Sequence, residues 1–178
     1  MIKFNEWILL RENMRNAVWL RGTAKGFELG LHDSIWGTLD QDEAKDYANQ
    51  FGKSGEQGTV SQFKLNPQAK VLEVAGDKIA LISKLYNWNP QQQQQILTSM
   101  KPGGQNADAD HRSLIQQMGG KPNAPWDLTQ MDTLLAQKLK SSGYDAAIMG
   151  GEWKGQIVVV NKRAITMVQP ADELNSNI

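Results

Sequence analysis

Short runs of alternating or nearly continuous apolar residues predict the strands of this chain. In the first run, Val18 and Leu20 alternate with Trp19 and Arg21, and this period of two is typical of a β-strand. The run QIVVV at 156–160 is apolar after its first residue, which predicts a strand buried on both faces. The seven runs lie at 17–21, 34–39, 59–65, 70–74, 144–149, 156–160 and 164–168.

Apolar residues at helical spacing predict the helices between these runs. The first 16 residues are expected to form an amphipathic helix that docks on the domain. Asp40 and Glu43 have the spacing of a capping box, as have Asp127 and Gln130, so each pair is expected to open a helix. The expected helices lie at 1–16, 40–51, 77–88 and 127–142, with one or two short helices at about 90–100 and 109–118.

Strands and helices therefore follow one another in groups rather than in strict alternation. This order is typical of an α+β domain with mainly antiparallel pairing and flanking helices. The 178 residues fit a single domain. We divide it into a docking helix, a first half, a variable segment of helices and loops, a closing helix with strands, and a polar tail. Their bounds are 1–16, 17–75, 76–126, 127–168 and 169–178.

Composition excludes several classes of protein. The chain has 19 Lys and Arg against 19 Asp and Glu, and zero net charge argues against a binder of nucleic-acid phosphates. It has no cysteine and two histidines, so disulfides, thiolate sites and a three-histidine metal site are excluded, and no metal is expected. No apolar run approaches the roughly 20 residues of a membrane span. Charged residues also interrupt the apolar stretch near the N-terminus, so we expect no signal peptide and a cytoplasmic protein, or one delivered into a host cytoplasm.

The common catalytic and phosphate-binding motifs are missing from the sequence. No glycine motif for a dinucleotide follows a strand, and no P-loop is present. A serine triad would need His32 or His111, and neither has a nucleophile elbow nearby. The acidic residues Asp40, Asp42, Glu43 and Asp46 are interpreted as negative charge at the start of a helix.

What remains is a series of short motifs in a fixed order. A strand ends in Arg21-Gly22-Thr23, the next carries Trp36-Gly37-Thr38, and the helix after it presents Tyr47. Further motifs are the strand pair Val60 to Val74, the tetrapeptide Gly143 to Ala146 and the strand that begins at Gln156. Taken together, the series resembles the ADP-ribosyltransferase-like family, over residues 17–168 except 76–126.

The resemblance implies a fold and a ligand. The family splits its domain into two facing, mainly antiparallel sheets and binds NAD in the cleft between them. Arg21, in the Arg-Gly-Thr motif completed by Gly22 and Thr23, would contact the pyrophosphate or the adenosine ribose. Gly22 would present its backbone to the nicotinamide amide. The implied contacts also include stacking of the nicotinamide ring between Trp36 and Tyr47, and a hydroxyl contact from Thr38.

The resemblance places Gln156 at the position of the family's catalytic glutamate. Glu152, four residues earlier in a turn, is the alternative catalytic acid if the register is shifted. Two functions follow from the resemblance. One is an NAD-dependent mono-ADP-ribosyltransferase, a glycosyltransferase in its bond chemistry, which modifies a protein held by segment 76–126. An effector of a phage or mobile element would fit this function. The other is a non-catalytic module of the same fold that binds a nucleotide or a protein.

Overall fold

The computed structural model describes residues 12–23, 34–50, 58–99, 107–121, 128–150 and 155–169. Within these ranges it contains the seven expected strands, with bounds shifted by a few residues at most. They are β1 (Trp19–Thr23), β2 (Ile35–Thr38), β3 (Thr59–Leu65), β4 (Val71–Val74), β5 (Ala146–Met149), β6 (Gln156–Val159) and β7 (Ile165–Gln169). β1 begins later than expected because residues 12–15 are helical and the N–H of Ala17 still donates to the carbonyl of Met14.

The helices of the described ranges also lie close to their expected positions. They are α2 (Gln41–Gln50), α3 (Lys78–Tyr86), α4 (Pro90–Ser99), α5 (Ala107–Gln117), α6 (Leu128–Ser141) and the short 3₁₀ helix η1 (Lys162–Ala164). Asp77 caps α3, and its Oδ1 accepts hydrogen bonds from the N–H groups of Ile79 and Ala80. The expected cap of α6, Asp127, lies outside the described residues. No helix in the described ranges is long and apolar enough to cross a membrane.

The strands form one hydrogen-bonded sheet in the order β4-β5-β6-β2-β1-β3-β7. Every neighbouring pair is antiparallel except β4 and β5, which confirms the α+β class with mainly antiparallel pairing. The expectation of two separate facing sheets is wrong, because hydrogen bonds connect all seven strands in one sheet.

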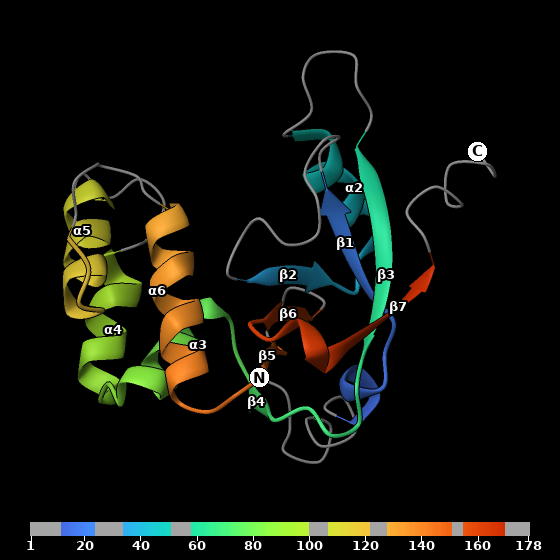
Figure 1. Cartoon of the computed structure of the whole chain (residues 1–178). Coiled ribbons are helices and arrows are strands. Elements are labelled where there is room, and N and C mark those ends of the chain that lie inside the picture. The colour runs from blue at the N-terminus through green and yellow to red at the C-terminus, as the bar shows by residue number, and fades with distance from the viewer. Residues whose placement is uncertain are drawn as a thin grey trace.

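At one place in the sheet, however, two neighbouring strands pair only briefly and the strand direction changes. β1 pairs with β3 over five residues, whereas β1 and β2 pair at Leu20 and Thr38 alone. Figure 1 shows β2 running in a very different direction from β1 and β3. Gly37 suits this tight junction, since a Cβ there would lie 2.8 Å from the ring of Phe63 and 3.1 Å from the carbonyl oxygen of Leu20. The sheet therefore curls at the β1–β2 junction.

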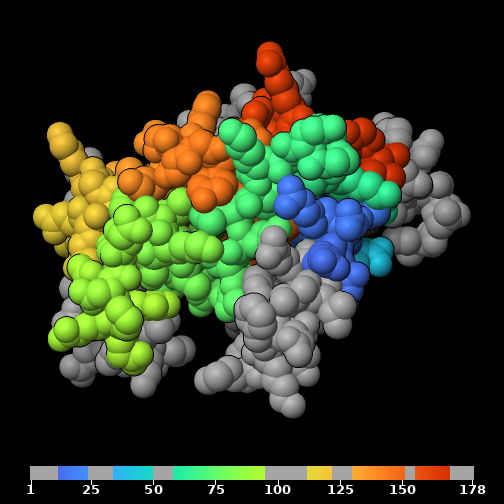
Figure 2. Space-filling view, turned by 90° about the horizontal axis from the view of Figure 1, so that it is seen from below, coloured from blue at the N-terminus to red at the C-terminus, as the bar shows by residue number. Residues whose placement is uncertain are grey.

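Apolar side chains pack on both faces of the sheet. One face lies on a core to which α3, α5 and α6 contribute Leu81, Ile82, Leu114, Leu135 and Leu139, all fully buried. Figures 1 and 2 show α3 to α6 gathered at one end of the molecule. Segment 76–126, expected as a variable insertion, thus contributes buried residues of α3 and α5 to this core.

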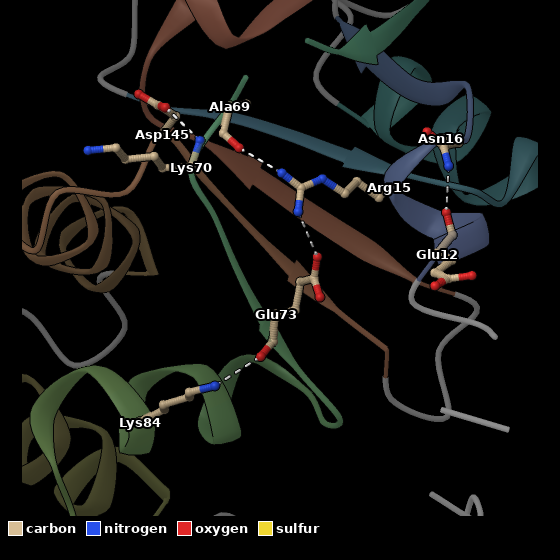
Figure 3. Close-up of polar contacts among 8 residues, drawn as sticks. All are labelled: Glu12, Arg15, Asn16, Ala69, Lys70, Glu73, Lys84 and Asp145. Atoms are coloured by element: carbon tan, nitrogen blue, oxygen red, sulfur yellow. Dashed lines mark hydrogen bonds and ion pairs between the residues drawn. The ribbon is translucent and has the colours of Figure 1, made fainter. Parts of the chain in front are cut away.

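The other face has its own core, and the N-terminal segment docks there. Its buried residues include Met14, Trp19, Phe63 and Ile157. Arg15 fixes the segment to the sheet edge: Nη2 donates to the carbonyl of Ala69 at 2.9 Å and Nη1 lies 3.6 Å from Oε1 of Glu73 (Figure 3). Residues 12–16 of the expected docking helix thus pack on the domain, and the rest of it lies outside the described residues.

Candidate functional site

The register of β2 and β6 brings three of the expected site residues onto one face of the sheet. Thr38 pairs with Gln156, and Trp36 pairs with Val158. Residues paired directly across antiparallel strands point to the same face, so Trp36, Thr38 and Gln156 share it. Val158 belongs to the core beneath the helices, which identifies this face as the helix-covered one. The chain turns from β2 directly into α2, so the first turn of α2 lies over the end of the strand.

Glu43 lies between Thr38 and Gln156, and its carboxylate joins them. Thr38 Oγ1 donates to Oε2 of Glu43 at 2.6 Å, and Gln156 Nε2 donates to Oε1 at 2.9 Å. We call these three residues the Glu43 cluster. Hydrogen bonds to a carboxylate are shorter and stronger than bonds between neutral groups. Thr38 is buried, while Glu43 and Gln156 are partly exposed. The cluster therefore presents a positioned negative charge at the start of β6.

The capping arrangement explains why the Glu43 carboxylate is available for this role. In a complete capping box, Glu43 would accept from the N–H of Asp40. Here the Asp40 N–H donates to Thr38 Oγ1 at 3.1 Å instead. Asp40 Oδ1 still caps the helix by accepting from the N–H groups of Asp42 and Glu43. The Glu43 side chain is thus directed to β6.

The two expected ring-binding residues lie near the cluster in different surroundings. Trp36 packs against the helix-covered core, and Lys78 Nζ lies over its ring, 4.4 Å from the centroid. Lys78 is also paired with Asp132 Oδ1 at 2.7 Å. Tyr47 is 48% exposed. Burial of part of its ring raises the pKa of Tyr47, and the charges of Glu43 and Asp132 raise it further. The lysine therefore covers one face of the ring that the resemblance assigns to stacking.

Arg21 points away from the Glu43 cluster. Side chains alternate along a strand, so Arg21 shares the face of Trp19, which lies in the core opposite the helices. The Arg21 guanidinium is partly buried, and desolvation lowers its pKa. Nη1 of Arg21 is buried and has no hydrogen-bond partner within the described part of the chain, like Nε1 of Trp19 and Oγ1 of Thr23. Arg21 and Thr23 are thus separated by the sheet from Trp36, Thr38 and Gln156.

Gly22 lies on the face of β1 opposite Arg21 and Thr23, where it has a packing role. A Cβ at Gly22 would lie 1.9 Å from the carbonyl oxygen of Ala44 and 2.6 Å from the nitrogen of Ala48. These are backbone atoms of α2, so no side-chain movement would relieve the clash. Gly22 therefore allows the helix that carries Glu43 and Tyr47 to lie directly against the strand.

Two residues of this site were not among the sequence candidates, and one candidate is not described. Glu43 was interpreted as a helix-start charge, and Lys78 was not singled out. The useful local signal for Glu43 was the hydroxyl of Thr38, five positions earlier. It can replace the Glu43 carboxylate as the acceptor of the Asp40 N–H. Nothing local placed Glu43 beside Gln156, 113 positions away. Glu152 lies outside the described residues.

The described residues contain no group of three or more His, Cys, Asp and Glu side chains that could hold a metal ion. Comparison of the chain with protein-family models, with curated proteins and with solved structures gave no match in any of the three. The chemistry of the site therefore has to be inferred from its own side chains.

Proposed function

We propose that this chain binds NAD over the Glu43 cluster and transfers ADP-ribose to a protein acceptor, as an ADP-ribosyltransferase-like domain. The observation that carries the proposal is the carboxylate of Glu43, held 2.9 Å from the amide of Gln156. Gln156 occupies the position that the resemblance assigns to a catalytic acid. In this proposal Glu43 supplies the negative charge that Gln156 lacks.

The reaction requires a negative charge near the nicotinamide ribose. The bond between ribose C1′ and the nicotinamide nitrogen breaks, and its electron pair leaves with nicotinamide. Positive charge then develops on the ribose, and a fixed carboxylate stabilises it. The acceptor nucleophile bonds to C1′ and releases a proton, for which Glu43 is the nearby base. Gln156 would orient a ribose hydroxyl through its amide.

The arrangement of β2, α2 and β6 supports this proposal. An aromatic residue, a hydroxyl and residue 156 lie on one face, and Tyr47 follows on the helix after β2. This is the order in which the resemblance places the nicotinamide contacts. The curl of the sheet at the β1–β2 junction also agrees with a domain whose strands run in two directions.

The phosphate contact is assigned differently from the sequence expectation. Arg21 lies on the opposite face of the sheet, whereas Lys78 is a cation on the same face as Trp36. We therefore propose that Lys78 moves off the Trp36 ring and binds the pyrophosphate when NAD enters. Phosphate oxygens would then replace Asp132 as the partner of Lys78. The nicotinamide ring would take the place of Lys78 over the Trp36 ring.

A non-catalytic binding module of the same fold is the second candidate. It is favoured by the neutral side chain at position 156 and by the separation of Arg21 from the Glu43 cluster. In that case the same face binds a nucleotide or a protein without bond cleavage.

Labelled NAD separates the two candidates. Wild type and Glu43→Gln are assayed for nicotinamide release and for transfer to lysate proteins, and NAD binding is measured by calorimetry. The matched control is Asp42→Asn, which removes an exposed carboxylate from the adjacent position of the same helix. The transferase predicts activity in wild type and the control, and a loss of about 10²–10³ in Glu43→Gln. Binding without cleavage in all three proteins supports the module, and no NAD binding refutes both the transferase and a module that binds NAD.

A further inference from the structure

A second candidate site lies at the opposite end of the β2–β6 pair. A cavity of about 560 Å³ opens there, and its lining includes Ile35, Val159 and Val160, whose side chains are buried. Its volume lies within the range of small-molecule sites. Ile35 pairs with Val159, three residues along β2 from the Thr38–Gln156 pair. At the rise of a β-strand this separation is about 10 Å, so the cavity is distinct from the Glu43 cluster.

Two turns with defined hydrogen bonds form the walls of the cavity. On one side, α6 ends and Gly143 reverses the chain at a φ of 81°, which places Lys140 and Tyr144 in the lining. On the other side, Asn161 caps η1, and its Oδ1 accepts from the N–H of Arg163 at 3.1 Å. The backbone on both sides is thus held in place, while the Lys140 and Arg163 side chains are exposed.

Positive charge and hydrogen-bond donors dominate the lining. Lys140, Lys162 and Arg163 line the cavity against a single carboxylate, Asp145. Both oxygens of Asp145 are already used: Oδ1 accepts from Asn161 Nδ2 at 2.7 Å and Oδ2 from the Lys70 N–H at 2.8 Å. Near the end of α6, the carbonyls of residues 138–140 accept hydrogen bonds from the N–H groups of residues 142–144. Asp145 keeps its negative charge, and the three cations outnumber it in the lining.

We propose that this cavity binds a phosphorylated small molecule of nucleotide size. Lys140 on one wall and Arg163 on the other would bind the phosphate, and the volume of the cavity leaves room for the rest of the molecule. Arg163 offers a planar fork suited to two phosphate oxygens. Ser34 and Tyr144 add hydroxyl groups to the lining. The proposal does not depend on NAD cleavage at the Glu43 cluster.

AMP and inorganic pyrophosphate are the probes for the test. Calorimetry and amide chemical shifts are recorded for wild type, for Lys140→Ala combined with Arg163→Ala, and for Lys64→Ala, an exposed lysine on β3, as the control. The proposal expects AMP to bind wild type and Lys64→Ala, with shifts at residues 140–145 and 159–163. The double variant should weaken AMP binding at least tenfold, and its thermal unfolding should match that of wild type, since both residues are exposed.

A second variant separates this site from the proposed NAD site. Glu43→Gln should leave AMP binding unchanged, because Glu43 lies at the other end of the strands. The proposal is overturned if wild type does not bind AMP, if the double variant binds it as tightly as wild type, or if AMP binding is lost in Glu43→Gln alone. Pyrophosphate binding with equal affinity to AMP would show that the cavity recognises the phosphate alone and would refute a site of nucleotide size.

Discussion

The side-chain amide of Gln156 donates to the carboxylate of Glu43 at 2.9 Å and so connects the first residue of β6 to the first turn of α2. Gln156 thereby has a carboxylate neighbour that another element supplies. A bond between residues 113 positions apart also ties the closing part of the chain to its first half. Its consequences can be tested by changing either partner.

Gln156→Glu should lower stability near neutral pH, because it places two carboxylates within hydrogen-bond distance of each other. The pair would share a proton, so the introduced carboxyl would have a raised pKa in the folded protein. Its protonated form therefore stabilises the fold at acid pH, and that stabilisation is lost as the pH rises through the raised pKa. Urea denaturation at several pH values should show the variant approaching wild type near pH 4 and falling below it at pH 7. Equal stability at both would contradict the contact with Glu43.

Gly22→Ala should be strongly destabilising, because its methyl group would overlap backbone atoms of α2. We expect a loss of about 2–4 kcal/mol in the free energy of unfolding. Chemical denaturation measures it, and Val18→Ala is a control at a more exposed position just before β1. A loss below 0.5 kcal/mol, on the order of a surface substitution, would show that α2 does not pack on the glycine.

Arg21→Met should leave NAD binding unchanged, because Arg21 lies on the face opposite the Glu43 cluster. Removal of a partly desolvated charge should keep the free energy of unfolding within about 1 kcal/mol of wild type, or raise it. Calorimetry with NAD and thermal unfolding give the two readouts, and Lys78→Met serves as the comparison on the proposed NAD face. Loss of NAD binding in Arg21→Met alone would show that Arg21, and not Lys78, contacts the phosphate.

Asp145→Asn should reduce the acid sensitivity of the fold. The hydrogen bond from the Lys70 backbone, then that from the Asn161 side chain, and the Lys70 charge together lower the pKa of Asp145, although burial opposes them. A carboxyl with a depressed folded pKa stabilises the protein above its unfolded pKa, and this contribution is lost as the pH falls through the folded value. The variant should therefore be less stable than wild type at pH 7, and the difference should shrink below about pH 4. A difference independent of pH would show that the charge does not contribute.

Local patterns in the sequence determined the secondary structure and the class of the fold. The alternation around Trp19 and Leu20, the apolar run of β6 and the cap at Asp40 each identify an element, because strand and helix periods and caps depend on neighbouring residues. The order of these elements was sufficient to predict an α+β domain with mainly antiparallel pairing.

The composition of the site was decided by tertiary structure. Sequence placed Arg21, Trp36 and Gln156 in one list, but strand alternation and the β2–β6 register put Arg21 on the far face of the sheet. It gave Glu43 a local capping role, and only the packing of α2 against Gly22, with β6 beside β2, brought its carboxylate to Gln156. Register and packing depend on contacts between distant segments. A local pattern can therefore predict an element but not which face of it contacts a partner.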